Sequence, residues 1–216
     1  MSYVLFGYWR SSAAYRVRIG LHLKGIPFEY RSVHLIKDGG EHRTAEFATK
    51  NPLKLVPVLQ TPEGEYITQS LAILEYLNDM HPEPAFLPKT HLQRAHVRAI
   101  SLVIACDIHP LNNLRVLQYL KNSLECSDEV RDNWYGHWIH EGFRAVEQTL
   151  QKTHRLYCVG NEISLADICL IPQVYNARRF NVPLSDYPLI SAIDERCREL
   201  PFFKQASPEV QIDAVK

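Results

Sequence analysis

The feature that most constrains the fold is residues 3–25, where a short apolar run passes through two adjacent serines into a helical pattern. Residues 4–6 are apolar and suit a buried strand, and the next apolar positions recur at helical spacing. Those positions are Ala14, Val17 and Leu21. Ser11 and Ser12 therefore lie at a helix entrance, where unpaired N–H groups and a partial positive charge favour an anion such as a thiolate. The alternative is that the serines only cap the helix.

The first third of the chain mixes strand and helix signals. Residues 27–33 suit a second strand, so the chain starts as a βαβ unit, and a short helix is expected at residues 44–49. Residues 56–59 and 65–68 flank Pro62-Glu63-Gly64, which is typical of a hairpin. A further helix is expected over residues 71–80, with Ser70 as its N-cap.

Strand signals end at residues 81–88, which contain three prolines, and only helical patterns follow. The patterns predict a long helix over residues 90–121 that bends at Pro110, then helices over residues 127–150 and 189–200. Ser164 and Asp167 form a capping box, which predicts the start of a buried helix. The segment after Pro201 is a tail without an assigned structure. We therefore predict two domains, residues 1–81 and 89–216.

The charge and cysteine content exclude several classes of protein. Lysine plus arginine and aspartate plus glutamate number 24 each, so no overall field favours nucleic acid, a membrane surface or an acidic polymer. The five cysteines are odd in number and include no Cys-x-x-Cys, which favours a reducing compartment. Residues 99–106 are too few to span a bilayer. The expectation is a cytoplasmic protein that contacts neither nucleic acid nor membrane.

His137, His140 and Glu141 could be considered as metal ligands at helical spacing. We expect no metal there, because catalytic zinc takes three protein ligands and the His-Glu-x-x-His spacing is absent. The nearby tryptophans indicate a packed helix instead.

Several longer motifs together resemble the zeta class of the glutathione transferase superfamily, which includes glutathione-dependent maleylacetoacetate isomerases. The resemblance covers nearly the whole chain. The motifs are Tyr-Trp-Arg-Ser-Ser-Ala-Ala-Tyr-Arg-Val-Arg-Ile at 8–19, His-Leu-Ile-Lys-Asp-Gly-Gly at 34–40, Asn-Pro-Leu-Lys-Leu-Val-Pro at 51–57, Gln-Ser-Leu-Ala-Ile at 69–73, Ile-His-Pro-Leu-Asn-Asn-Leu-Arg at 108–115 and Asn-Ala-Arg-Arg-Phe at 176–180. It implies an α/β thioredoxin-like N-terminal domain, an all-α C-terminal helical bundle, glutathione as cofactor and a homodimer.

The resemblance also implies a glutathione site. Ser11 and Ser12 would interact with the thiolate, with Ser11 as the first candidate, and a cis bond at Pro57 would turn the backbone of Val56 toward the cysteinyl part. The Gln-Ser pair would hold the γ-glutamyl carboxylate at a helix start. Besides Ser11, Ser12, Val56 and Pro57, the implied glutathione contacts are Ala13, His42, Asn113 and the Gln-Ser pair itself, Gln69 and Ser70. Ala13 stands where the family usually has cysteine, so no account that requires that cysteine applies to this chain.

A second set of residues would bind a substrate with two carboxylates. Its members are Arg10, His109, Asn113, Arg115 and Arg179. Arginine is the preferred partner of a carboxylate, yet arginines and histidines are also common on solvated helix faces, which is the alternative for each of them. Arg10 would also be part of the catalytic group with the two serines.

Three functions are compatible with these residues. The first is a glutathione-dependent cis–trans isomerase that converts maleylacetoacetate or maleylpyruvate, both small dicarboxylic diketo acids, to the fumaryl isomer in aromatic catabolism. The second is a transferase that conjugates or dehalogenates small electrophiles. The third is a non-enzymatic module, which would not need to keep Val56-Pro57, Gln69-Ser70 and the serine pair together.

Overall fold

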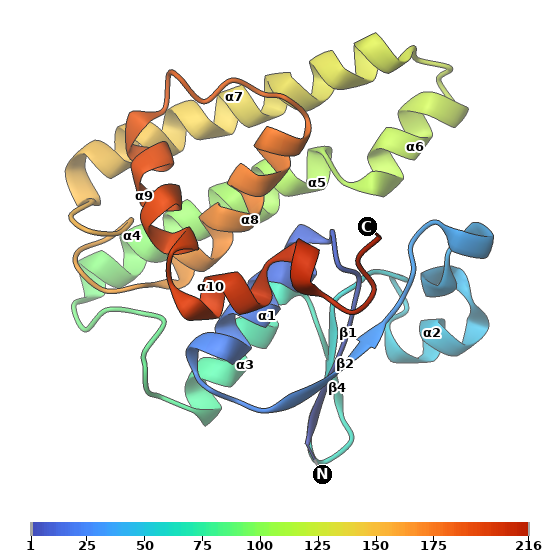
Figure 1. The fold of residues 1–216 in the computed structure, drawn as a ribbon, viewed down its shortest axis with the longest axis horizontal. Helices are drawn as coiled ribbons and strands as arrows, with labels where there is room; N and C mark the ends of the chain where they lie inside the picture. Colours follow the sequence, from blue (N-terminus) through green and yellow to red (C-terminus); the bar gives the residue numbers. More distant parts are fainter. Residues whose placement is uncertain (1, 216) are drawn as a thin grey trace. The chain divides into compact units, whose positions relative to one another are not determined.

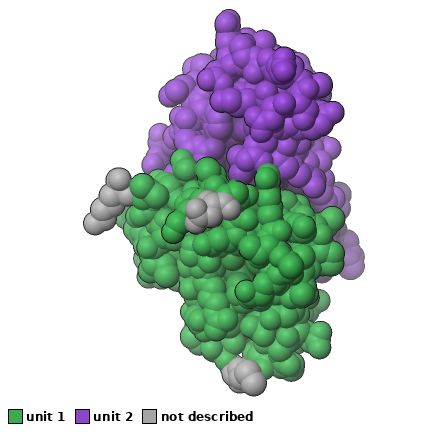
Figure 2. Space-filling model, turned by 90° about the vertical axis from the view of Figure 1, so that its right-hand side faces the viewer, with its two compact units in different colours: residues 1–85, 199–216 green, residues 86–198 purple. Residues whose placement is uncertain are grey.

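The computed structural model describes residues 2–215 of the chain and divides into two compact units. The first comprises Met1–Ala85 with Glu199–Lys216, and the second comprises Phe86–Arg198 (Figure 2). Our predicted domains, 1–81 and 89–216, differ in that they assign the C-terminal segment to the helical part. That residues 1–81 and 89–216 are independently folding domains stays a prediction.

The first unit is built on a four-stranded mixed sheet with the order β2-β1-β3-β4. Its strands are β1 (Tyr3–Gly7), β2 (Phe28–Ser32), β3 (Val58–Gln60) and β4 (Tyr66–Thr68). β1 and β2 are parallel, with Tyr3 opposite Phe28, and β3 is antiparallel to both β1 and β4. The predicted βαβ start and the hairpin are therefore confirmed.

The two faces of the sheet carry separate apolar clusters, because side chains alternate along a strand. Tyr3 and Leu5 of β1 pack with residues of α1 (Ser12–Leu23) and α3 (Ser70–Met80). Val4 and Phe6 pack on the other side against Phe47 of α2 (Ala45–Lys50). α1 and α3 thus cover one face and α2 the opposite face (Figure 1).

The connection from β4 to α3 differs from our prediction. Ser70 is the first residue of α3, and the N-cap is Gln69, which makes no side-chain capping bond. One residue links the end of β4 to the start of α3, and Gln69 makes this turn with φ 68° and ψ 117°. A positive φ in a residue other than glycine costs of order 1–3 kcal/mol, so the surrounding structure must hold Gln69 in this conformation.

The C-terminal segment, for which we assigned no structure, is ordered as α10 (Pro201–Ala206) and a 3₁₀ turn, η4 (Pro208–Val210). α10 packs against α1 within the first unit. The buried guanidinium of Arg18 donates through Nε to the carbonyl oxygen of Ala206 at 2.9 Å. This long-range contact has no local signature in the sequence, which explains why the tail was missed.

The second unit is entirely helical. Its elements are α4 (His91–Leu102), the π-helical segment η3 (Val103–Ile108), α5 (His109–Leu111), α6 (Leu114–Asn122), α7 (Asp128–Thr153), α8 (Leu165–Arg179) and α9 (Pro188–Arg198). α8 is the central helix, since nearly all its residues are buried and it packs against both α4 and α9. Among residues 2–215, no helix is both long enough and apolar enough to cross a membrane.

The predicted long helix over 90–121 is interrupted, but not at Pro110. The chain stays helical through Leu111 and restarts at Leu114, where the Asn113 side chain caps α6 by accepting from the Arg115 N–H at 3.1 Å. Pro110, which cannot donate a helical hydrogen bond, follows the π-helical segment η3, where the regular i→i−4 bonding pattern is already replaced. The interruption follows from asparagine capping, which competes with helix continuation.

The predicted capping box at the start of α8 is confirmed. Asp167 is fully buried, and its carboxylate accepts from the backbone N–H of Ser164 and of Cys158, each at 2.9 Å. The same carboxylate accepts from the Ser164 hydroxyl at 2.8 Å. Asp167 therefore joins the helix start to the preceding loop.

We expect Asp167→Ala to lower the free energy of unfolding by at least about 2 kcal/mol, because two buried N–H groups lose their acceptor. For a chain of this length that corresponds to a fall in Tm of about 4–8 °C in a thermal scan. The matched control is Asp186→Ala at an exposed position, which should stay within about 0.5 kcal/mol of the parent. Equal stability of the two variants would contradict the structural role of Asp167.

Candidate active site

The serine turn, residues 8–12, connects β1 to α1. The Ser11 N–H donates to the Tyr8 carbonyl at 2.9 Å, and Ser11 Oγ accepts the Ala14 N–H at 3.2 Å. Ser11 is therefore the N-cap, as one alternative expected, while the buried Ser12 is the first helical residue. Capping uses only an acceptor site of the hydroxyl, so its proton can still be donated to an anion at the helix entrance.

Arg10 projects from the same turn and is half-buried. Its guanidinium lies over the Trp9 ring, 4.6 Å from the centroid, and Nη2 donates to the Tyr8 hydroxyl at 3.5 Å. Stacking on an aromatic ring limits the rotamers of an arginine but leaves most of its donors able to bind a carboxylate.

His42 lies in η2 (Glu41–Arg43), which follows η1 (Lys37–Gly39) and leads into α2. Its imidazole is buried against Gly40, where an added Cβ would lie 2.7 Å from Nδ1. Gly40 also has φ +99°, so this position requires glycine. Burial lowers the pKa of His42, so the ring is neutral at physiological pH. Within residues 2–215, its Nδ1 is buried without a hydrogen-bond partner.

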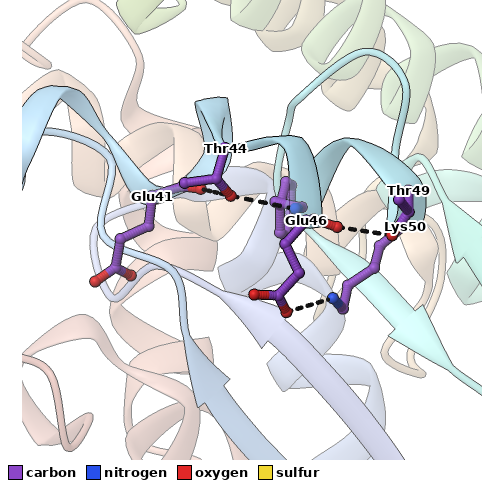
Figure 3. Close-up of polar contacts among 6 residues, drawn as sticks. Glu41, Thr44, Glu46, Thr49 and Lys50 are labelled. Carbon is purple, nitrogen blue, oxygen red and sulfur yellow. Dashed lines mark hydrogen bonds and ion pairs between the residues drawn. The ribbon is translucent and has the colours of Figure 1, made fainter.

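The segment after His42 is fixed by side-chain caps at the start of α2 (Figure 3). Thr44 Oγ1 donates to the Glu41 carbonyl at 2.9 Å and accepts the Phe47 N–H at 3.2 Å. Glu46 pairs with Lys50 at 2.9 Å one helical turn later. These local contacts position the loop that carries His42.

The remaining predicted glutathione residues of this unit lie at the ends of β3 and β4. The Val56–Pro57 peptide bond is cis, as the resemblance implied, and both residues precede the paired part of β3. The N-terminus of α3 begins at the buried Ser70. Since no side chain among the described residues caps α3, its first N–H groups are free to interact with an anion.

Arg16 is a site residue that the sequence analysis missed. Its side chain is 1% exposed, and Nη1 donates to Ser70 Oγ at 3.3 Å. This bond joins α1 to the start of α3 and adds a buried positive charge beside the helix terminus. The sequence signal is a pair of arginines, Arg16 and Arg18, in a helix whose other residues are mostly apolar, and buried arginines are unusual.

We expect Ser70→Ala to weaken glutathione binding by about 1.5–3 kcal/mol, about 10- to 150-fold in Kd, because a charge-assisted hydrogen bond is lost. The turnover number at saturating glutathione should change little, and calorimetry would measure the affinity. Ser101→Ala is the matched control, since Ser101 is also buried in a helix and its hydroxyl donates to the Val97 carbonyl of the same helix. Unchanged affinity in Ser70→Ala would mean that the anion site lies elsewhere.

In the second unit, His109, Asn113 and Arg115 lie around the helix interruption described above. α7 holds this interruption through two hydrogen bonds, from Asn112 Nδ2 to the Tyr135 carbonyl at 3.1 Å and from Trp134 Nε1 to the Leu111 carbonyl at 2.9 Å. His109 and Asn113 are half-buried, and Arg115 is exposed.

Arg179 is tied to the same region through Tyr135. The Tyr135 and Phe180 rings are stacked with centroids 3.6 Å apart, and the Arg179 guanidinium lies 4.7 Å from the Phe180 centroid. Burial raises the pKa of Tyr135, and the Arg179 charge opposes that shift. Tyr135 therefore contacts both segments that carry the predicted substrate residues, which sequence reasoning did not find.

Arg178, the neighbour of Arg179, has a different role. It pairs with the buried carboxylate of Asp194 at 2.8 Å, and Arg198 pairs with the same carboxylate at 3.0 Å. Arg178 is thus part of the packing of α8 on α9. Within the described part of the chain, no three metal-ligating side chains are grouped to hold an ion.

Comparisons of the sequence and of the structure with known proteins identify the same family. The model for the glutathione S-transferase N-terminal domain matches residues 10–80, and that for the C-terminal domain matches residues 139–201. A probable maleylacetoacetate isomerase of Vibrio cholerae is 53% identical over 99% of each chain. A holo maleyl pyruvate isomerase, described as a bacterial zeta-class glutathione transferase, is 42% identical with a TM-score of 0.94, over 98% of this chain and 100% of the other. The chain belongs to the zeta class of glutathione transferases.

The chain is also similar to a solved structure that contains glutathione. A maleylacetoacetate isomerase from Anaeromyxobacter dehalogenans, solved with glutathione in its active site, is 39% identical with a TM-score of 0.89, over 99% of this chain and 98% of the other. As a zeta-class chain, the present protein combines the expected thioredoxin-like and all-helical parts. Its Ala13, the second residue of α1, is buried at the helix entrance.

Proposed function

We propose that this protein is a glutathione-dependent cis–trans isomerase of a small maleyl diketo acid, maleylacetoacetate or maleylpyruvate. The main support is the serine turn, which places the Ser11 hydroxyl at the start of a helix in a chain whose relatives carry these names. The names of those relatives include both acids, so we propose the shared maleyl diketo acid as the substrate class.

Three observations support the fit of glutathione to the first unit. α3 starts without a side-chain cap, which suits the γ-glutamyl carboxylate, and Gln69 holds its strained backbone at that point. His42 presents a buried Nδ1 in need of a partner. We therefore propose Gln69, Ser70, Val56, Pro57 and His42 as the groups of the first unit that hold glutathione.

When bound, glutathione would supply a thiolate whose reversible addition turns the cis double bond into a single bond, with the negative charge passing to the conjugated carbonyl oxygen, so that rotation can precede expulsion of the thiolate. A free thiol has a pKa of about 8.5, so useful rates at neutral pH require stabilisation of the charged form. We propose that Ser11 donates its hydroxyl proton to the sulfur. Ser12, Ala13 and the first N–H groups of α1 complete the helix entrance and add its partial positive charge.

Arg10, Arg115 and Arg179 are proposed to bind the two carboxylates of the substrate, and His109 and Asn113 to contact its polar groups. A dianion loses hydration on binding, which is costly unless each carboxylate meets a charged partner. We also propose that the protein forms a homodimer and is located in the cytoplasm.

The proposal is tested by steady-state kinetics on maleylacetoacetate and maleylpyruvate, each with and without glutathione, followed by identification of the product. The expected result is the fumaryl isomer of at least one acid, formed only when glutathione is present. A glutathione conjugate as the main product would favour the transferase function instead. Failure to bind glutathione-agarose would favour a non-enzymatic module.

A further inference from the structure

The C-terminal segment, Glu199–Lys216, reaches the serine turn through the buried Arg18 of α1. Arg18 is fully buried, and its Nη2 donates to the Trp9 carbonyl at 2.9 Å. Its Nε donates to the carbonyl of Ala206 at the end of α10, also at 2.9 Å. One guanidinium therefore connects the carbonyl side of Trp9 to the C-terminal segment.

Asp213 binds the other polar group of the Trp9 backbone, its N–H. Its Oδ2 accepts the Trp9 N–H at 3.1 Å, the Ser32 hydroxyl at 2.9 Å and the Tyr30 hydroxyl at 3.3 Å. Ser32 and Tyr30 belong to β2, so the carboxylate joins the tail, the sheet edge and the turn. Asp213 lies 204 positions after Trp9, and this contact could not be read from local sequence.

The Trp9 peptide groups depend on these two residues. Trp9 lies after β1, which ends at Gly7, and before α1, which starts at Ser12, so neither a strand ladder nor a helix holds it. Within residues 2–215, its N–H bonds to Asp213 and its C=O to Arg18. The next two residues are Arg10 and Ser11, and the Arg10 guanidinium lies on the Trp9 ring. Movement of Trp9 would displace both.

We propose that Asp213 is a positioning residue for the serine turn, which holds Ser11 and Arg10 in the geometry that activates the thiol and receives the substrate. This inference rests on the proposed function, because it assigns those two roles to Ser11 and Arg10. A misplacement of about 1 Å in a catalytic group can cost about 10²-fold in rate, so a hydrogen bond to the turn has a large effect without touching the substrate.

A purely structural role for Asp213 is the competing explanation. The carboxylate could fasten the tail to β2 through Ser32 and Tyr30, with no consequence for the turn. That role would lower Tm when Asp213 is replaced but would leave the kinetics of the folded enzyme unchanged. The positioning role therefore predicts a lower kcat and a shifted titration of the bound thiol when Asp213 is replaced, whereas the structural role predicts neither change.

The experiment compares Asp213→Ala, Asp213→Asn, Ser32→Ala and Glu209→Ala in the full-length chain. Asparagine keeps an oxygen that can accept the Trp9 N–H, and Ser32→Ala removes a different partner of the same carboxylate. Glu209 is an exposed carboxylate of the same segment and controls for charge. The measurements are glutathione Kd by calorimetry, kcat against pH, and the ultraviolet absorbance of the thiolate in the complex with glutathione.

We expect Asp213→Ala to lower kcat by about tenfold or more while glutathione Kd changes by less than about twofold. The thiolate titration should move to higher pH, because the Ser11 donor is displaced. Asp213→Asn should recover part of kcat, and Ser32→Ala and Glu209→Ala should resemble the parent.

A lowered Tm with unchanged kcat and unchanged thiolate titration in Asp213→Ala would overturn the inference. So would a loss of kcat in Ser32→Ala as large as that in Asp213→Ala. If the parent isomerises neither diketo acid, the proposed function fails. The thiolate titration of the complex with glutathione then still decides the inference, because it requires no substrate.

Discussion

Ser11→Ala is expected to lower kcat for isomerisation by about 10²-fold, the usual loss when one preorganised donor to a developing or stabilised anion is removed. Glutathione Kd should change by less than about twofold, because the peptide is held mainly by groups of α3 and the loop before β3. Steady-state kinetics at saturating glutathione and calorimetry would measure the two quantities. Ser12→Ala should have the smaller effect, since Ser11 is the residue at the N-cap.

The capping role of Ser11 requires a control, because Ala at an N-cap also destabilises the helix by about 1 kcal/mol. Ser11→Gly separates the two effects, since Gly at an N-cap costs only a few tenths of a kcal/mol and also lacks the hydroxyl. We expect near-parental Tm and strongly reduced kcat in this variant. Activity near the parental value in Ser11→Gly would show that the hydroxyl does not act on the thiolate.

Arg115→Met is expected to reduce kcat/KM for the diketo acid by about 10²-fold, because a carboxylate loses a charged, forked partner worth about 3 kcal/mol. Conjugation of a neutral electrophile should change by less than about twofold, since no carboxylate is involved. The comparison of these two reactions in one variant separates substrate binding from damage to the thiolate site.

Arg144→Met is the matched control for Arg115→Met. Arg144 is an exposed arginine of the same unit that pairs with Glu141 on the surface of α7. Surface pairs of this kind contribute about 0–1 kcal/mol, so both reactions should stay near the parental rates. Normal isomerisation by Arg115→Met would remove Arg115 from the substrate site and leave Arg10 and Arg179 as the candidates.

The parts of the fold that sequence could predict are those set by local chemistry. Val4, Leu5 and Phe6 alternate between the two faces of the sheet, and the pair Ser164 and Asp167 caps α8 as its spacing indicated. These features depend on residues within a few positions of one another. Patterns of this kind can be interpreted from the local sequence alone, without knowledge of tertiary contacts.

The features that sequence could not predict depend on distant partners or on unusual backbone. Gln69 adopts a conformation that favours glycine, because a single residue must join β4 to α3. The tail is ordered through Arg18 and Asp213, which lie far apart in the chain. The helix interruption at Asn113 is held by a hydrogen bond from Trp134 of α7, a contact across 23 residues that the local pattern around Pro110 does not reveal.

The central claim is that the thiol of glutathione is a catalyst that the protein activates, and one measurement tests it most directly. The measurement is the ratio of fumaryl product formed to glutathione consumed in a single reaction with limiting glutathione. The account predicts many product molecules for each glutathione present and no loss of free thiol at the end. Consumption of one glutathione for each product molecule, or product formation at the full rate without glutathione, would contradict it.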